Sequence, residues 1–226
     1  LGAPVPDYPR RLSFADAGSR LAVLDGIDGV HPEVAATFAA FAGRASARYG
    51  ACGRVAFASL DDCYVLADIC SKVEAATLHG SWMRERAGRY SQAVYSRTEP
   101  GLGIPAVRYL ETLLIRAAVL REFLDGPMAG FDVLTCPTLP VPVPTRIEAD
   151  MEAPGRVFGV VAQITALTRP FNYLGLPVLS MPIGRDANGM PIGAQLIGRP
   201  FGEARLLAVA RRLRVVDPES RREVAP

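Results

Sequence analysis

Apolar and polar positions along this chain follow two periods, one typical of strands and one typical of helices. Short apolar runs predict strands at residues 20–26, 54–60 and 131–137, and two more between residues 176 and 198. Longer runs with apolar side chains three or four residues apart predict helices at residues 32–50, 63–86, 104–124, 157–167 and 202–213. Strands alternating with helices, together with one hairpin, indicate an α/β fold with a mixed β-sheet layered between helices.

The residues at the helix ends and along the helix faces sharpen these predictions. Pro32 suits the first position of its helix and Gly50 its end, while Asp61 or Asp62 can cap the next helix. We expect the apolar face of each helix to point toward the core. Helical spacing predicts that these faces contain Val34, Phe38, Phe41, Ala45 and Tyr49 in the first helix, Ile69, Val73 and Thr77 in the second, and Val107, Leu110, Leu114, Ala117 and Phe123 or Leu124 in the third.

One stretch near the end of the chain is rich in residues that weaken strands. TRPFNYLGLPVLSMPIG, from Thr168 to Gly184, contains three prolines and two glycines. Proline cannot donate to a sheet ladder, and glycine adds no packing surface. We therefore expect the backbone there to bend, or to come unusually close to a neighbour, as it approaches a buried strand. Beyond it, the Asn188-Gly189 pair predicts the turn of a hairpin.

Composition narrows the classes of partner. The 226 residues are 50% hydrophobic and carry 25 basic and 23 acidic side chains, a net charge of +2 that argues against nucleic-acid binding. No apolar run reaches the length of about 18 to 20 residues that a membrane span needs, so we expect a cytoplasmic protein. Four scattered cysteines and two histidines offer no metal-ligand spacing, so we expect neither a metal nor another cofactor.

Reactive side chains do not form a recognisable catalytic set. Ser180 lies at a strand position, where a core hydroxyl is expected. Cys136 follows an apolar strand, but a nitrilase-like mechanism would need a glutamate and Lys72 beside it, and Lys72 is expected to be a solvated charge on a helix. Asp61 and Asp62 are better explained as helix caps than as catalytic carboxylates.

Four segments, in order, resemble the amidase signature family. FDVLTCPTLPVPVP, TRPFNYLGLPVLSMPIG and NGMPIGAQLIGRPFGEARLLAVARRL are similar to its C-terminal half, and HGSWMRERAGRYSQAVYSRTEPGLGIPAVRYLETLLIRA is similar to its middle helical region. The resemblance covers nearly the whole chain, which implies that residues 1–226 are the C-terminal part of one amidase domain. Residues 1–19 are expected to form a linker-like lead, and residues 216–226 a frayed tail.

The resemblance implies a hydrolase of carboxylic amides with a Ser, cis-Ser and Lys triad. That family's Gly/Ser-rich signature and catalytic Lys lie upstream of the region matched here, no GGSSGG-like run occurs in this sequence, and Lys72 lies in the wrong segment. The resemblance therefore places no catalytic residue in this chain. It implies that an N-terminal half of the same protein supplies the triad, that this chain completes the sheet and the pocket wall, and that the isolated chain is inactive.

The resemblance also implies four residues of a pocket for a small amide substrate. Arg97 matches an Arg that in relatives reaches the substrate's polar end, although a solvated helix Arg explains it equally well. Asn172 and Gly175 fall in the loop below the acyl site, where Asn172 is expected to hold the loop backbone. Thr165 stands where A subunits of glutamine-dependent tRNA amidotransferases tend to be acidic, which favours a general amidase.

Two other functions stay open. One is such an amidotransferase A subunit, and the other is a non-catalytic remnant that acts as a binding or assembly module. The sequence also leaves open whether the protein forms a homodimer.

Overall fold

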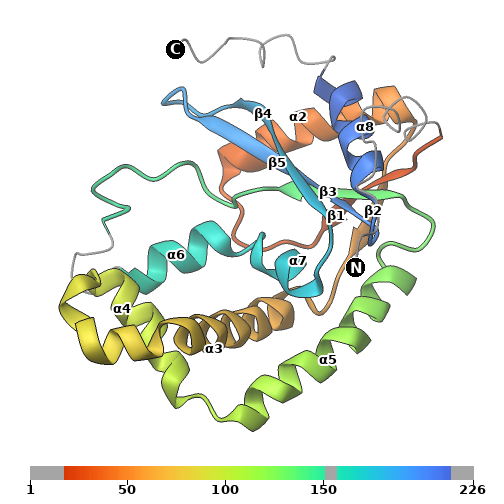
Figure 1. Cartoon of the computed structure of the whole chain (residues 1–226). Coiled ribbons are helices and arrows are strands. Elements are labelled where there is room, and N and C mark those ends of the chain that lie inside the picture. Colours follow the sequence, from red (N-terminus) through yellow and green to blue (C-terminus); the bar gives the residue numbers. More distant parts are fainter. Residues whose placement is uncertain (1–17, 151–156, 215–226) are drawn as a thin grey trace. The chain divides into compact units, whose positions relative to one another are not determined.

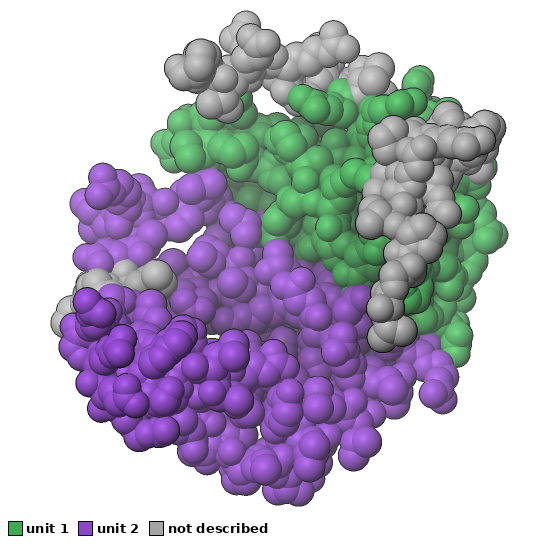
Figure 2. Space-filling view, in the orientation of Figure 1, with its two compact units in different colours: residues 1–57, 124–138, 176–226 green, residues 58–123, 139–175 purple. Residues whose placement is uncertain are grey.

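The computed structural model describes residues 18–150 and 157–214 and divides the chain into two compact units (Figure 2). Unit 1 comprises residues 1–57, 124–138 and 176–226, and unit 2 comprises residues 58–123 and 139–175. The expected frayed tail and nearly all of the expected lead lie outside the described residues. The assignment of the whole chain to one domain stays a prediction.

Unit 1 contains a mixed five-stranded sheet in the described part of the chain (Figure 1). The strand order is β2-β1-β3-β5-β4, with β1 parallel to β2 and β3, and β5 antiparallel to β3 and β4. The strands span Leu21–Asp25 (β1), Gly53–Ala56 (β2), Val133–Pro137 (β3), Val178–Arg185 (β4) and Pro191–Gly198 (β5). The predicted α/β class with a mixed sheet is confirmed.

Two helices pack on this sheet, α2 (Pro32–Tyr49) and α8 (Glu203–Arg214). Pro32 begins α2 and Gly50, with φ +85°, follows its last residue, as predicted. The predicted inner face is also confirmed, with four positions buried and Tyr49 partly buried. Together with α8 and the strands this face forms one apolar core, whose largest members include Phe38, Phe41, Leu196, Leu206 and Leu213.

The strand β4 differs from its prediction. It pairs only with β5 within the described sheet, and of its eight residues only Met181 and Ile183 are buried. It is therefore an edge strand and not a buried one. Proline is tolerated on an edge, and the pairing shifts register between Pro182 and Gly184. The hairpin turn is confirmed, with Gly189 at φ +79°.

Unit 2 is helical in its described residues. Its α-helices are α3 (Leu60–Arg86), α4 (Gln92–Thr98), α5 (Ala106–Asp125), α6 (Val157–Thr165) and α7 (Arg169–Leu174), and its 3₁₀ helices are η1 (Ala87–Arg89) and η2 (Glu99–Gly103). The helices α3, α5 and α6 were predicted, whereas α4 and α7 were not.

The start of α3 differs from the prediction too. The strand before it ends at Ala56 instead of residue 60, because Ser59 already occupies the N-cap position. The side chain of Ser59 caps nothing and donates to the Glu122 carboxylate at 2.9 Å. Asp61 and Asp62 are not caps but lie in the first turn, where their negative charge complements the helix dipole.

The buried face of α3 is not the predicted one. Ile69 and Val73 are only half-buried and Thr77 is exposed, whereas the buried positions are Cys63, Ala67, Ala76, Gly80 and Met83. The reason is a close contact with η2. A Cβ on Gly101 would lie 2.0 Å from the carbonyl oxygen of Lys72, so the contact admits only small side chains on both helices.

The predicted inner face of α5 is likewise wrong, except at Phe123. Its apolar stripe at Val107, Leu110 and Leu114 is exposed, while Thr112 and Phe123 are buried. α5 instead packs on α7, through an edge-to-face contact of Phe123 with Phe171 and a hydrogen bond that the Tyr173 hydroxyl donates to the Thr112 carbonyl oxygen. These contacts lie on a different side of the helix from Val107, Leu110 and Leu114.

Candidate functional site

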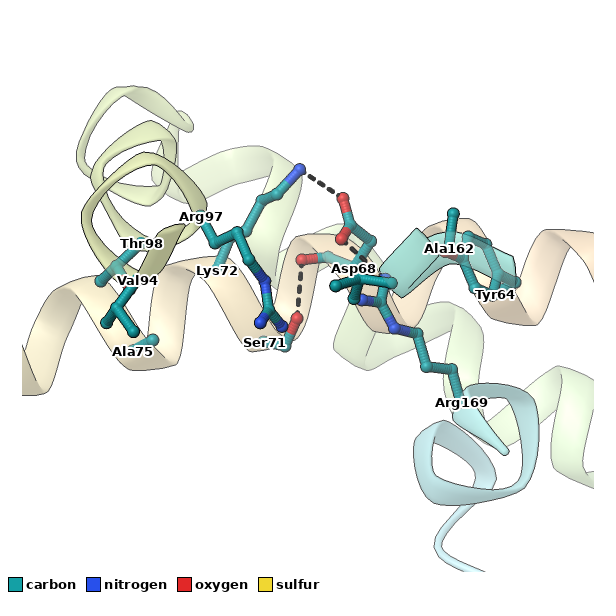
Figure 3. Close-up of a pocket in the computed structure, with 11 residues that line it drawn as sticks. Tyr64, Asp68, Ser71, Lys72, Ala75, Val94, Arg97, Thr98, Ala162 and Arg169 are labelled. Atoms are coloured by element: carbon teal, nitrogen blue, oxygen red, sulfur yellow. Dashed lines mark hydrogen bonds and ion pairs between the residues drawn. The ribbon is translucent and has the colours of Figure 1, made fainter. Parts of the chain in front are cut away.

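A cavity of about 440 Å³ in unit 2 collects charged side chains from three helices (Figure 3). Its size falls within the usual range for small-molecule sites. Both apolar and polar side chains line it, and we call it the unit 2 pocket. Its lining residues are Tyr64, Asp68, Ser71, Lys72, Ala75, Val94, Arg97, Thr98, Val161, Ala162 and Arg169.

Asp68 organises the charges of the unit 2 pocket. It lies one turn before Lys72 on α3, so the two side chains share one face of the helix. Lys72 Nζ donates to Asp68 Oδ2 at 2.5 Å, and Arg169 donates to Asp68 Oδ1 at 2.9 Å. The three side chains are 18 to 31% exposed, so solvent screens these ion pairs less than it screens surface pairs.

Arg169 is fixed by a second contact. It is the first residue of α7, followed by Pro170, which favours the start of a helix there. Its guanidinium lies over the Tyr64 ring, 4.9 Å from the ring centroid. The ring and the Asp68 carboxylate together hold the Arg169 side chain against α3, as Figure 3 shows.

Arg97 enters the unit 2 pocket from the last turn of α4. The Ser91 side chain caps this short helix by accepting from the Val94 amide at 3.3 Å. Arg97 is half-buried and extends toward the face of α3 that carries Ser71 (Figure 3). Within the described residues its guanidinium makes no hydrogen bond or ion pair, in contrast to Lys72 and Arg169.

The other three predicted pocket residues do not line this cavity. Thr165 ends α6 and donates its hydroxyl to the Val161 carbonyl oxygen at 2.6 Å. Asn172 is exposed on α7, and in the described residues its side chain makes no hydrogen bond, although its backbone oxygen accepts from the Gly175 amide at 3.1 Å. Gly175 adopts φ +69° to end α7, and a Cβ there would lie 2.3 Å from an Arg116 nitrogen. The expected close approach in the Thr168–Gly184 stretch occurs at both of its glycines, since a Cβ on Gly184 would lie 2.6 Å from the Thr37 side chain.

Two residues that could act as nucleophiles are Ser180 and Cys136. Ser180 lies elsewhere than predicted, and Cys136 lacks the exposure that a reactive thiol needs. Ser180 is exposed on β4, not in the core, and its Oγ lies 2.7 Å from Thr138 Oγ1. Cys136 is fully buried on β3, and this burial raises the pKa of its thiol to about 12, although a hydrogen bond from Gln195 opposes the rise. A buried neutral thiol is a poor nucleophile.

The ion-paired centre of the unit 2 pocket was not predicted from the sequence. Lys72 was expected to be a solvated charge, but it is 25% exposed and paired with Asp68. The Asp68–Lys72 spacing of four residues was a local signal that could have revealed this pair. Arg169 lies 101 residues from Asp68, and no local pattern joins them.

A second cavity, of about 220 Å³, lies in unit 1 and has a different character. It is lined mainly by apolar side chains of β1 and α2, and its charged members, Asp25 and Arg54, are bound to each other at 2.8 Å. Both are well exposed, at 47 and 69%. The described residues contain no cluster of metal-ligating side chains and no helix that could cross a membrane.

Comparisons with known sequences point to one family. The family model described as Amidase matches residues 25–207. The chain is 30% identical to the A subunit of glutamyl-tRNA(Gln) amidotransferase from Thermosynechococcus vestitus, over 93% of this chain and 48% of that protein. It is 31% identical to an amidase from Pseudomonas putida, over 52% of this chain and 25% of that protein. The chain thus spans about half, or less, of the length of these relatives.

Comparison with solved structures agrees with the sequence matches. A crystal structure of an amidase superposes with a TM-score of 0.76 at 25% identity, covering 88% of this chain and 46% of that chain. A protein from a vestigial complex, described as revealing the evolutionary origins of an s-triazine catabolic enzyme, superposes with a TM-score of 0.79 at 24% identity. That alignment covers 96% of this chain and 47% of the other, and at this identity it shows a shared fold.

Proposed function

We propose, from the premise that the chain belongs to the amidase family, that it is the C-terminal part of a cytoplasmic enzyme that hydrolyses carboxylic amides. The observation that carries the proposal is the family match, which extends over residues 25–207. The similarity to an amidase over half of the chain supports the same reaction.

The chemistry itself is assigned to the part of the protein that this chain does not include. There, a serine of a Ser/cis-Ser/Lys triad would attack the amide carbonyl, and its proton would pass through the lysine to the departing amine. Water would then cleave the acyl-enzyme to the carboxylic acid, with backbone N–H groups binding the oxyanion. Lys72 is not assigned as the base, because its ammonium is engaged by Asp68.

This chain's part is to form a wall of the substrate site. Arg97 is assigned to the polar end of the substrate, because it reaches into the unit 2 pocket without a protein partner among the described residues. Thr165, Asn172 and Gly175 are assigned an indirect part. Their bonds shape the α6–α7 segment, which presents Val161 and Arg169 to the pocket.

Activity of two proteins tests the proposal. The complete gene product and the isolated 226-residue chain would each be incubated with a panel of aliphatic and aryl amides, and release of ammonia or arylamine would be measured. We expect turnover by the complete protein and none by the isolated chain. Turnover by the isolated chain, or its absence from both across the panel, would contradict the proposal.

An amidotransferase A subunit is the second candidate, since several relatives carry that name. The neutral Thr165 argues against it, because it offers no charge to a glutamine ammonium. Purification of the complete protein from its native cells separates the two. Co-purifying partner chains and glutamine-dependent ammonia release favour the amidotransferase, whereas amide hydrolysis by a monomer or homodimer favours the amidase.

A non-catalytic remnant is the third candidate, and the upstream reading frame decides it. A catalytic Lys and a Gly/Ser-rich run preceding Leu1 would exclude this candidate. Their loss would favour a binding or assembly module.

A further inference from the structure

Helix α5 carries exposed apolar side chains along one side, at the edge of unit 2 (Figure 1). Of the fifteen large apolar side chains that are well exposed among the described residues, five lie between residues 107 and 115 of this helix. Such a concentration marks an interaction site, whereas single exposed apolar side chains need no explanation. We use the name α5 stripe for the exposed residues Val107, Leu110, Leu113, Leu114, Ala117 and Ala118.

The contacts that bind α5 to its neighbours lie on the opposite side of the helix. Thr112 and Phe123 are buried, and the Tyr109 hydroxyl donates to Glu74 on α3 at 3.2 Å. At about 100° per residue these three positions of α5 lie within about 60° of one another around the helix axis, and Leu114 lies about 180° from their centre. The described packing of unit 2 therefore does not use the α5 stripe.

The spacing within the α5 stripe suits a second helix. Val107, Leu110, Leu114 and Ala117 follow one another at intervals of three, four and three residues, the pattern by which two helices pack side by side. In an antiparallel pair centred near Leu114, the large Leu110 of one copy would face the small Ala117 and Ala118 of the other. The charged side chains of α5 are three basic and three acidic, so two copies of the helix carry no net charge that would repel them.

The area of the α5 stripe is close to what a specific dimer needs. Half-exposed side chains of this size together offer roughly 300 Å² of apolar surface. Two copies would bury about 600 Å², and because about 60% of an interface is apolar, the whole contact would reach about 1,000 Å². This area is the lower bound for a specific interface, so we expect association at about micromolar concentrations.

We infer that the α5 stripe is the two-fold interface of a homodimer, in which α5 of one copy packs against α5 of a second copy. The inference concerns assembly and goes beyond the proposed reaction. α5 contributes none of the described residues that line the unit 2 pocket, so this interface leaves that cavity free to bind a substrate.

Analytical ultracentrifugation of the complete protein tests the interface. We expect a dimer at tens of micromolar, in rapid exchange with the monomer. Leu114 is 77% exposed at the centre of the stripe, and Leu114→Glu should raise the dissociation constant at least about 10-fold, because the pair would bury two like charges. Leu78→Glu is the matched control, at a leucine of α3 that is 72% exposed and lies outside the stripe, and it should leave the dimer unchanged.

A cross-link provides a second readout that does not depend on losing the dimer. The central residues of a two-fold interface approach their own copies, so mild oxidation should join two molecules of Leu114→Cys by a disulfide. Leu78→Cys, with the same four native cysteines, should remain uncross-linked.

Three results would overturn the inference. The first is a complete protein that stays monomeric up to hundreds of micromolar, well above the expected range. The second is a dimer that Leu114→Glu leaves intact and Leu114→Cys does not cross-link. The third is a Leu114→Glu protein that melts more than about 3 °C lower than wild type at a concentration at which both are monomers, since exposed substitutions have smaller effects. In that case another part of the same protein covers the α5 stripe.

Discussion

The two units of this chain differ in how some of their helices pack and in where their charged groups lie. Unit 1 surrounds a sheet with large apolar side chains, such as Phe38, Phe41 and Leu196, that are almost completely buried. Unit 2 packs α3 on η2 through Gly101 and small residues, and it places an ion-paired cluster in its cavity. The core of unit 1 is therefore apolar, whereas the cavity of unit 2 is lined by charged groups.

The charged pairs of the two units make the same point. Asp25 and Arg54 in unit 1 are well exposed and satisfy each other. Asp68 in unit 2 is shared by two cations and lies beside a third that has no partner in the described residues. Unpaired charge in a cavity costs stability, so the described residues of unit 2 do not compensate this charge as unit 1 compensates Asp25 and Arg54.

The largest expected effect is on the core of unit 1. Leu196 on β5 is completely buried, so Leu196→Ala should lower the free energy of unfolding by about 4 kcal/mol, through lost burial and the cavity that remains. Leu207→Ala, at a partly exposed position on α8, is the matched control and should cost about 1 kcal/mol. Urea denaturation of the complete protein measures both. Equal losses would show that unit 1 does not depend on dense packing around β5.

In unit 2 the change expected to destabilise the protein is an added side-chain volume, at the contact between α3 and η2. A Cβ on Gly101 meets the backbone of Lys72, which cannot move aside, so Gly101→Ala should destabilise the protein by about 3 kcal/mol. Gly103→Ala is the control, since a Cβ there meets nothing within 4 Å. Gly53→Ala in unit 1 meets the Phe131 ring, a side chain that can rotate, and should cost less. A neutral Gly101→Ala would contradict the tight α3–η2 contact.

Buried thiols provide a smaller and pH-dependent effect in each unit. Burial raises the pKa of Cys136 in unit 1 and of Cys63 in unit 2 to about 12. The folded protein therefore holds these protons more tightly than the unfolded chain. This stabilising contribution is complete below about pH 9 and is lost as the pH rises toward 12, by up to about 1.4 kcal/mol per pH unit and thiol.

The corresponding measurement is the urea midpoint between about pH 8 and 10.5, the range in which an unfolded thiol titrates. Cys136→Ala and Cys63→Ala should each flatten its decline, whatever their effect on stability at the lower end of that range. If only one variant does so, the buried-thiol environment differs between the units. An unchanged slope in both would show that neither thiol titrates in this range on unfolding.

The difference in packing between the two units also explains which buried faces could be predicted from the sequence. In unit 1, period and turn residues predicted α2 and the β4–β5 hairpin, because large apolar side chains mark its buried face. In unit 2, periodicity selected Leu110 and Leu114 on α5, which are exposed, because α5 packs on α7 on another side. On α3, the contact through Gly101 and Ala76 leaves no apolar signal.

The candidate site could be predicted only where a local motif existed. Arg97 could be identified from the family resemblance, and it does line the unit 2 pocket. Asp68 had a local partner at Lys72, but its bond to Arg169 depends on the packing of α7 against α3. Such long-range pairs follow from tertiary structure, which neither spacing nor composition encodes.

The smallest effect tests whether the Asp68 cluster is structural. Asp68→Asn keeps the shape of the side chain but directs an NH₂ group at one of two cations, so it should destabilise by about 1 kcal/mol, a value reduced for partial solvent screening. Asp25→Asn in unit 1 removes a more exposed pair and should cost under about 0.5 kcal/mol. Urea midpoints in low and high salt measure both, and salt should reduce the Asp25 effect more. If Asp68→Asn proved stabilising, the ion pairs of Asp68 would cost more in desolvation than they contribute to folding.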